Sequence, residues 1–533
     1  MVKVGMASPA QQYQAPSVRF GRSQIDMARS HKTSFDAGRL IPYFVEEVIP
    51  GDTFVVDATL FGRVFSPLNA PIMDDIEWTI DFFYTPNRIL WENWHAMLGE
   101  HDSAGAQDTT FTVPTLATGG TIGQGSLAHY FGIPIGLTTS DVEVQALPFR
   151  AYVAIYNEWY RDQNLINSKT EDTDDSAMAL SRYNASPLKS AKRHDYFTSA
   201  LPYLQKGTAQ VAGLTGHVAV ATDALDNEDV GVYQTGDSGW RKLDIGTGTH
   251  LEMDGTAASE YLYADFDQAL PGQTAGGISI NALREAAAVQ RLLEKDARAG
   301  TRPNELVRAH FGVEVPDFRI DRPEYLGGGR GFINATPIPN NTAIDSTNDP
   351  GGSDRYPGEL AGTAAGSLRA KFAKSFVEHG WVIGIIRARG AVSYSQGLDR
   401  MWSRTEKLDF LWPELAQLGE QPIYNKELWI QGDSTDDDVF GYQERYADYR
   451  FAKNLITGQF DPAYTTTLDF WHLSEEFGSQ PSLNQTFVED QTPMSRVTVV
   501  DTQHDFIVDG RIDCKVARVL PVRPVPTLMP ARF

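Results

Sequence analysis

The sequence has a single cysteine, Cys514, and no long hydrophobic run. One thiol cannot form an intrachain disulfide, and it cannot supply the ligands of a Cys₄ or Cys₂His₂ zinc site. No stretch approaches the roughly 18 consecutive apolar residues of a membrane span, and the N-terminus has no apolar signal segment. We therefore expect a soluble protein of a thiol-reducing compartment, with no membrane insertion.

Basic residues are scarce: 46 Lys and Arg stand against 69 Asp and Glu, a net charge of −23. This balance argues against a surface that binds nucleic acid everywhere or lies on an anionic membrane. The ends differ, because residues 1–39 hold six bases and two acids, and residues 511–533 hold five bases and one acid. Residues 207–277 contain 12 glycines and eleven acids against two bases. We expect a basic N-terminal arm, a basic C-terminal strand and tail, and an acidic surface excursion between them.

The 46 glycines and 29 prolines leave room for few long helices. Apolar residues alternate with polar ones in two stretches, which predicts strands with one buried face: Phe54, Val56, Ala58 and Leu60, then Ile76, Trp78, Ile80 and Phe82. Asp509-Gly510 suits a tight hairpin turn, after which Cys514 faces inward as a small core residue. Apolar spacing of three and four predicts helices over residues 150–163 and 280–298.

The tetrapeptide Gly236-Asp237-Ser238-Gly239 matches the surroundings of the nucleophile in chymotrypsin-like proteases. A serine nucleophile needs a positioned histidine base, and the Ala-Ala-His-Cys motif that supplies it in that family is absent. The match lies in the Gly-rich acidic stretch, where it suits a turn. We therefore predict no catalytic role for Ser238.

Two other stretches combine a binding chemistry with a plainer alternative. The acidic run Asp433, Asp436, Asp437 and Asp438 offers the oxygens that Ca²⁺ prefers, but it lacks EF-hand spacing, which favours a solvated acidic turn. The glycines of residues 327–331 resemble a phosphate nest without the Gly-Lys-Ser/Thr of a P-loop, which favours a flexible turn. The 11 histidines show neither HExxH nor HxH spacing. The sequence thus predicts no metal site and no cofactor.

A carbohydrate-active enzyme or lectin with a β-sandwich, of bacterial origin, is the alternative to a structural role. The 69 acids and 10 tryptophans leave room for a catalytic carboxylate pair and for stacking platforms, although nothing singles out such a pair. This alternative predicts dispersed monomers that bind or hydrolyse glycans.

Long stretches of the chain share one order with a known family. They include HKTSFDAGRLIPYFVEEVIPGDTF (31–54), PIMDDIEWTIDFFYTPNRILWENW (71–94), LPFRAYVAIYNEWYRDQNL (147–165), KSFVEHGWVIGIIRARG (374–390) and LDFWHLSEEFGSQPSLN (468–484). These stretches resemble the major capsid proteins of the Microviridae, specifically of the gokushovirus branch. Residues 207–277 match poorly, as expected for the variable insertion that forms the protrusion at the threefold axes of gokushoviruses.

The resemblance implies an all-β fold over residues 40–533, an eight-stranded antiparallel jelly roll of the viral coat type with large loop insertions and a few helices. It implies a virion protein without enzymatic activity, assembled in the host bacterial cytoplasm. Sixty copies would form a T=1 icosahedral shell around circular single-stranded DNA. The other implied partners are an internal scaffolding protein, a small basic DNA-binding protein, a pilot protein and a host cell-surface receptor.

Two site hypotheses follow. The N-terminal arm has no clear strand pattern before about Leu40, and its bases are expected to face the packaged DNA: Lys3, Arg19, Arg22, Arg29 and Lys32. The alternative is an arm that lies on a neighbouring subunit. The excursion at 207–277 is expected to project outward and recognise the host through Asp223, Asp226, Asp229, Tyr233, Asp237, Trp240 and Asp254. Its alternative is a passive loop.

Tryptophans in expected loops have two interpretations. Trp91, Trp94, Trp402 and Trp412 serve either contacts between subunits or the subunit's own core, and the sequence does not separate the two.

Overall fold

The structure is a computed structural model that describes residues 21–98, 111–117, 119–139, 142–183, 185–207, 231–233, 240–245, 251–253, 280–298, 303–312, 321–339, 341, 358–520 and 522. The chain divides into two compact units, one formed by Met1–Leu204 with Gly300–Phe533 and the other by Gln205–Ala299. Each unit is described by itself.

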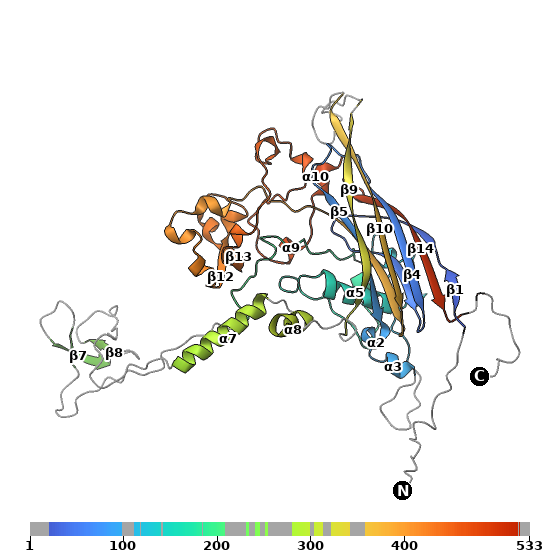
Figure 1. The fold of residues 1–533 in the computed structure, drawn as a ribbon, viewed down its shortest axis with the longest axis horizontal. Coiled ribbons are helices and arrows are strands. Elements are labelled where there is room, and N and C mark those ends of the chain that lie inside the picture. The colour runs from blue at the N-terminus through green and yellow to red at the C-terminus, as the bar shows by residue number, and fades with distance from the viewer. Residues whose placement is uncertain are drawn as a thin grey trace, which may run out of the picture. The chain divides into compact units, whose positions relative to one another are not determined.

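The larger unit is built on one antiparallel sheet (Figure 1). Its strands are β1 (Ser23–Asp26), β2 (Arg29–Phe35), β3 (Ile41–Val48), β4 (Thr53–Val64), β5 (Ile76–Pro86), β9 (Glu324–Pro339), β10 (Leu360–Ser375), β11 (Gly380–Gly390) and β14 (Phe506–Arg518). The order is β1-β14-β4-β10-β9-β5-β11-β3, and β2 pairs with β14 beyond the end of β1.

Eight of these strands form two four-stranded halves of a jelly roll. We call β2, β14, β4 and β10 the β4 half, and β9, β5, β11 and β3 the β11 half. The long strand β9 joins the halves, because residues 324–333 pair with β5 and residues 334–339 pair with β10. The sheet therefore curls on itself, and the expected all-β coat-type fold is confirmed.

The main core lies between the two halves. The two predicted alternating patterns are confirmed: Phe54, Val56, Ala58 and Leu60 on β4, and Ile76, Trp78, Ile80 and Phe82 on β5, are all buried there. Each large side chain of this kind contributes about 1.5–3 kcal/mol through burial. Cys514 is also buried in this core, as predicted.

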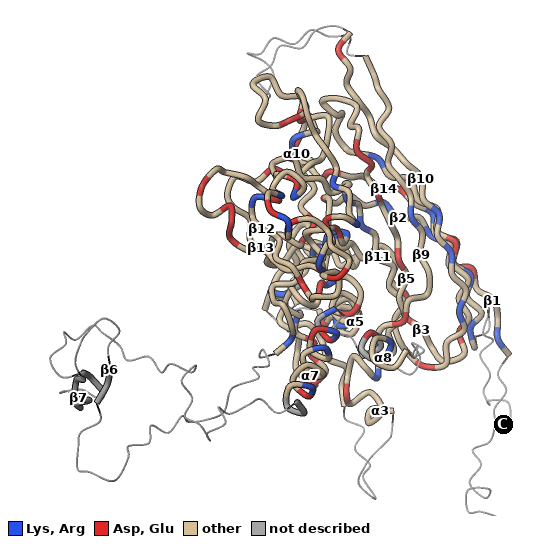
Figure 2. Tube along the Cα trace, turned by 60° about the vertical axis from the view of Figure 1, so that its left-hand side comes forward, with Lys and Arg blue, Asp and Glu red and all other residues tan. Residues whose placement is uncertain are grey.

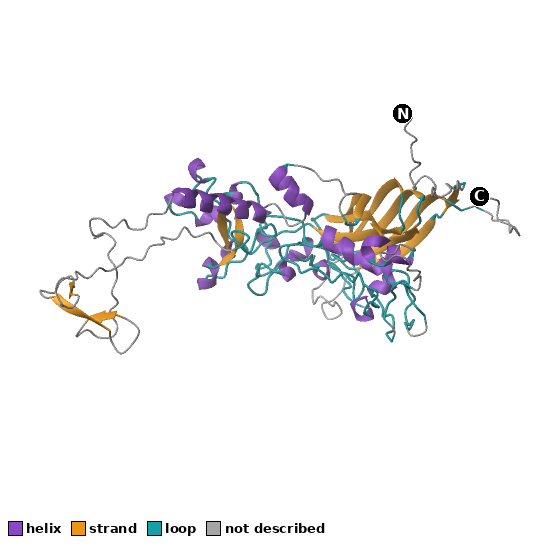
Figure 3. Ribbon diagram, turned by 90° about the horizontal axis from the view of Figure 1, so that it is seen from below, coloured by secondary structure: helices purple, strands orange, loops and turns teal. Residues whose placement is uncertain are grey.

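The outer face of the β11 half is covered by helix α5 (Leu147–Ile155), which continues as the π-helical turn η1 (Tyr156–Tyr160). Phe83, Ile383 and Ile385 point away from the main core and pack with α5 in a second core. Every residue of α5 is buried, so the helix has more than the single apolar stripe that the sequence predicted. Helices and loops of this unit gather along one side of the strands (Figure 3).

The outer face of the β4 half is not covered by any part of the chain that the structure describes. Burial along β4 alternates strictly, and Val55 and Phe61 on its outer face are exposed. Asp57 on this face pairs with Arg369 and Lys371 of the neighbouring strand β10. Figure 2 shows basic and acidic positions interleaved along these strands.

The predicted hairpin at Asp509-Gly510 is wrong, because β14 runs straight through both residues. Gly510 is buried opposite Leu60, and a Cβ atom there would lie 2.4 Å from the Tyr43 hydroxyl. The glycine therefore permits close packing of strand against strand.

The predicted turn or phosphate nest at residues 327–331 is also wrong, because these residues lie inside β9. A Cβ atom at Gly329 would lie 2.4 Å from the carbonyl oxygen of Arg369 on β10. The glycines let β9 pass closely between the two halves.

The larger unit has further short elements around the sheet. Its helices are α2 (Asn87–Leu90), α3 (Trp94–Met97), α4 (Leu127–Tyr130), α6 (Leu180–Tyr183), α8 (Pro303–Phe311), α9 (Gln485–Val488) and α10 (Met494–Val497). Its 3₁₀ turns are η4 (Arg400–Ser403), η5 (Lys407–Asp409), η6 (Pro413–Leu415), η7 (Asn425–Glu427), η8 (Ser434–Asp437), η9 (Ala447–Tyr449), η10 (Gly458–Phe460) and η11 (Asp469–Trp471). A two-stranded sheet, β12 (Glu420–Tyr424) with β13 (Val439–Glu444), lies over a third small core.

In its described residues, the smaller unit has a three-stranded antiparallel sheet and one helix. The strands β6 (Gly231–Tyr233), β7 (Trp240–Ile245) and β8 (Leu251–Met253) pair in that order. The helix α7 (Ile280–Arg298) has the predicted bounds, but none of its described side chains is buried.

Neither a membrane span nor a metal cluster is found in the described part of the chain. No helix there is long and apolar enough to cross a bilayer. No group of three or more His, Cys, Asp or Glu residues there is arranged to hold a metal ion.

Candidate nucleic-acid interface

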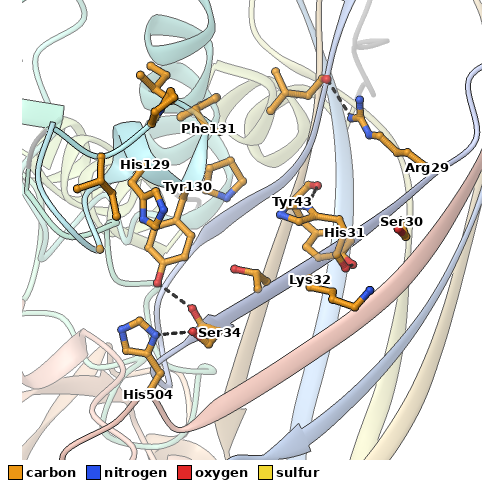
Figure 4. Close-up of a pocket in the computed structure, with 18 residues that line it drawn as sticks. Arg29, Ser30, His31, Lys32, Ser34, Tyr43, His129, Tyr130, Phe131 and His504 are labelled. Carbon is orange, nitrogen blue, oxygen red and sulfur yellow. Dashed lines mark hydrogen bonds between the residues drawn. The ribbon is translucent and has the colours of Figure 1, made fainter. Parts of the chain in front are cut away.

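A pocket of about 680 Å³ opens beside strand β2 (Figure 4). We call it the β2 pocket; β2 and β3 line it on one side, and the segment from Gly125 to Ile135, which contains α4, lines it on the other. None of its lining residues is Asp or Glu, although the chain has 69 acids. The lining itself therefore carries no negative charge, and the acids Glu46 and Asp509 pair with its two cations from outside it.

One wall of the β2 pocket is a stacked pair of rings. The His31 and Tyr43 rings lie 4.4 Å apart between centroids and 15° from parallel. The Tyr43 hydroxyl donates a hydrogen bond to the carbonyl oxygen of His31 at 2.6 Å, and His31 Nδ1 lies 2.8 Å from the carbonyl oxygen of Tyr43. Burial lowers the pKa of His31, with a smaller effect from the Arg29 charge. The imidazole is thus held neutral near pH 7.

A second set of contacts fixes the other side of the pocket. The Tyr130 hydroxyl donates to the Ser34 carbonyl oxygen at 2.8 Å, and the Ser34 hydroxyl lies 2.9 Å from His504 Nδ1. Burial raises the pKa of Tyr130 to about 12, so its hydroxyl stays protonated. These bonds connect β2, α4 and the segment before β14 in one rigid wall.

Two cations of the arm lie at the pocket. Arg29 pairs with Glu46, donates to the Val45 carbonyl oxygen at 3.1 Å and stands 4.9 Å over the Phe44 ring. The Lys32 ammonium is 3.6 Å from Asp509, and both side chains are exposed. Because a long, solvated pair of this kind is weak, Lys32 can exchange its partner for a phosphate.

The arrangement combines aromatic and imidazole rings with cations and lacks carboxylates. The partly exposed rings of His31, Tyr130 and His504 suit single-stranded nucleic acid, whose bases stack on rings and whose phosphates pair with cations. The buried Tyr43 supports His31 from behind. The Ser34 and His504 pair does not form a catalytic triad, because His504 makes no hydrogen bond to a carboxylate within the described residues.

The structure brings together only part of the predicted DNA-facing set. Lys3 and Arg19 lie outside the described residues. Arg22 donates to the Gly51 carbonyl oxygen at 2.6 Å, and it does not line the β2 pocket. The expectation of a strand-free segment before Leu40 is wrong for residues 23–35, which form β1 and β2 on the edge of β14.

Sequence reasoning missed the rings that make the pocket: His31, Tyr43, Tyr130 and His504. They come from four separate parts of the chain, and no local motif connects them. Only the pairing of β2 with the distant strand β14 brings His504 beside Ser34.

Most of the predicted host-recognition residues lie outside the described residues, namely Asp223, Asp226, Asp229, Asp237 and Asp254. The tetrapeptide 236–239 lies there too. Tyr233 and Trp240 are described, and they stand opposite each other where β6 pairs with β7.

Two carboxylates of the acidic run at residues 433–438 accept hydrogen bonds from backbone N–H groups of the same loop. Asp433 Oδ1 accepts a hydrogen bond from the Thr435 backbone at 2.9 Å. The two oxygens of Asp436 accept from the backbone of Gln431 and Gly432. This run is a capped turn, in line with the acidic-turn interpretation.

The four tryptophans separate into two kinds. Trp91 is fully buried in the second core, and Trp94 packs against that core. Trp402 and Trp412 are exposed. The first two serve the subunit's own core, and the other two do not.

Comparison with known proteins agrees with this architecture. The family model described as "Capsid protein (F protein)" matches residues 13–528. The chain is 40% identical to the capsid protein VP1 of Bdellovibrio phage phiMH2K over 92% of both chains, and 36% identical to that of Chlamydia phage 1 over 97% of both. It is 30% identical to the capsid protein VP1 of Spiroplasma virus 4 over 95% of both chains. The chain therefore belongs to the F capsid protein family of phages, with gokushoviruses of the Microviridae as its relatives.

Proposed function

We propose that this phage capsid protein forms a T=1 shell of sixty copies around circular single-stranded DNA. The observation that supports the proposal is the jelly roll itself, in which one half leaves a sheet face uncovered by the described part of its own chain. A closed shell needs recurring contacts between identical subunits, and loops and bare faces are where a β-sandwich offers them. An internal scaffolding protein and a pilot protein complete the proposed assembly in the host cytoplasm.

Negative-stain microscopy of particles from expressing host cells tests the shell. We expect closed particles of one diameter, with a mass that corresponds to sixty chains. Dispersed monomers that bind or hydrolyse glycans would instead favour the carbohydrate-active alternative.

The proposal also assigns the β2 pocket and the basic arm to the inner surface, against the DNA. Its support is the pocket lining, which includes no acid, and the rings that stand beside Lys32 in that lining. The arm has few charges, so a small basic DNA-binding protein would neutralise most of the genome.

Glutamine at Lys3, Arg19, Arg22, Arg29 and Lys32 tests this assignment. We expect less DNA per particle and a weaker dependence of DNA retention on salt. The reason is that a variant with fewer phosphate contacts releases fewer counterions when it binds DNA. Lys426→Gln with Arg182→Gln is the control, since each of these bases pairs with an acid outside the arm. Unchanged packaging in the fivefold variant contradicts the DNA role.

For residues 207–277 the proposal is an outward surface that recognises the host receptor. Eleven acids against two bases suit a solvated exterior and would repel DNA. Replacement of residues 208–275 by a short Gly/Ser linker should leave shells intact and abolish adsorption to host cells. Normal adsorption would place the receptor site elsewhere, and failed assembly would assign the segment to the shell.

A further inference from the structure

An exposed apolar surface lies on the loops that precede β12. We call it the Trp402 surface: Met401, Trp402, Leu408, Phe410, Leu411 and Trp412, all of them exposed. Trp402 is 71% exposed and Leu408 is 62% exposed. Single exposed apolar residues need no explanation, but six within twelve consecutive residues are a concentration of the kind that marks an interaction site.

Polar contacts hold this surface in place from beneath. Arg404 pairs with Asp448 and stands 4.1 Å over the Tyr449 ring. Arg400 donates to the Pro422 carbonyl oxygen at 2.7 Å and pairs with the buried Glu427 at 3.2 Å. The loop is therefore fixed although its apolar side chains remain exposed.

Tyr446 adds a strained support. It is the one non-glycine residue of the described chain with a left-handed backbone, at φ 63°. Its hydroxyl accepts a hydrogen bond from the Trp412 backbone at 3.1 Å, and its own backbone N–H donates to Gln421 at 3.0 Å. Such a conformation costs about 1–3 kcal/mol and persists where the surroundings over-determine it. A strained backbone conformation at Tyr446 that holds an exposed loop in place is consistent with a surface that is preorganised for a partner.

The net charge of this region favours a second copy of the chain over DNA as the partner. Residues 400–412 and 445–453 together hold six bases and three acids, and with Glu427 and Glu444, which pair with Arg400 and Arg450, the net charge is +1, whereas the whole chain carries −23. The rest of each chain is thus strongly negative, so this region attracts another copy where most other pairs of surfaces repel. Arg400, Arg404 and Arg450 already pair with acids, which leaves few free cations for phosphates.

We propose that the Trp402 surface is a contact between subunits, and that a second copy of this chain covers it in the shell. The proposal rests on the assembly described under Proposed function. Tryptophan, methionine and leucine side chains around arginines are the composition of an interface centre. The partner surface on the second copy is different from this one, because two regions of net positive charge do not attract each other.

Site-specific labelling tests the proposal. Leu408→Cys adds an exposed thiol, while the native Cys514 is buried and burial raises its pKa to about 12, so maleimide reports only the new site. We expect the labelling rate in DNA-filled and in DNA-free particles to be at least about tenfold lower than in unassembled subunits. Val377→Cys, on the exposed connection between β10 and β11, is the reference site for accessibility.

Each other outcome overturns the proposal in its own way. Equal, fast labelling in particles and subunits means that the surface faces solvent, even though shells form. Equal, slow labelling means that the chain's own segments cover it. Protection confined to DNA-filled particles means that DNA covers it.

A substitution gives an independent readout. Trp402→Asp should lower the yield of particles at least about tenfold, because burying a carboxylate in an apolar contact is costly. Its unassembled subunit should keep the wild-type melting temperature, since Trp402 contributes little to the subunit's core. Val377→Asp, at an equally exposed apolar position, should assemble normally. Wild-type particle yield from Trp402→Asp would contradict the proposal.

Discussion

Along β5 and β11, in the β11 half of the jelly roll, most side chains on both sheet faces are buried, whereas along β4 and β14, in the β4 half, every second side chain is exposed or only partly buried. Ile383 and Ile385 on β11 are buried under α5, while Val382 and Ile386 face the main core. On β4 the inner Phe54 is fully buried, and the outer Val55 and Phe61 are exposed. A sheet covered on both faces has continuous apolar runs, and a sheet covered on one face alternates. The difference identifies the sheet face that the described part of the subunit leaves uncovered.

The largest effect is expected from matched phenylalanines on the two outer faces. Phe83→Ala should lower the free energy of unfolding by about 3–5 kcal/mol, because it leaves a cavity among Trp159, Tyr160 and Tyr325. Phe61→Ala should change it by no more than about 0.5 kcal/mol. Denaturant titration of unassembled subunits measures both. Equal effects would show that the β4 half is covered within the subunit.

A smaller effect is expected where one end of β14 meets the β11 half. Arg518 donates to the carboxylate of Asp52, which is fully buried, and to the Glu47 carbonyl oxygen of β3. Arg518→Ala should cost about 2–3 kcal/mol, because it leaves a buried carboxylate without its cation. Arg518→Lys should recover part of the loss in the same titration, since it restores the charge without the two-pronged geometry. No loss in the alanine variant would contradict the pairing.

At the other end of β14, Asp505 should make stability depend on pH. Its carboxylate accepts a hydrogen bond from the Ala37 backbone at 2.9 Å, and burial raises its pKa to about 6. The folded state then binds more protons than the unfolded state between about pH 4 and 6, so this contribution is present below pH 4 and is lost as the pH rises through 6. Asp505→Asn should therefore gain up to about 2 kcal/mol relative to wild type between pH 4 and 7. A pH-independent difference in the unfolding free energies would refute this assignment.

The smallest effect is expected on the bare face itself. Hydrogen bonds and charge from Arg369 and then Lys371 hold the pKa of Asp57 below its usual range, but these side chains are largely exposed. Because solvent screens such pairs, Arg369→Ala should leave the denaturation midpoint of the free subunit within error of wild type. A clear effect on particle yield from the same variant would place this face in an assembly contact. A large effect on the subunit's midpoint would mean that the face is not solvated.

Much of the β4 half was predictable from sequence, because the alternation of apolar and polar residues along a strand indicates which side chains face inward. The β11 half was only partly predictable, since its outer face is buried by α5, which lies more than 60 residues after β5 in the chain and more than 200 before β11. Asp509-Gly510 misled prediction because a glycine that avoids a steric clash looks the same as a glycine that makes a turn. The candidate site was the least predictable part, as Tyr43, Tyr130 and His504 meet only in the folded chain.

The sequence by itself determined the inward faces of β4 and β5, the buried position of Cys514, the span of α7, and the capsid family through long ordered stretches. These properties depend on residues that are close together in the chain or on the order of its stretches, so the sequence alone shows them. The tertiary structure alone decided that Trp91 lies in the core while Trp402 is exposed, that Lys32 stands beside a pocket without acids, and that Gly329 and Gly510 serve close strand packing. The physical reason is that burial, charge environment and steric fit at one residue are set by segments distant in the chain, which only the pairing of strands brings together.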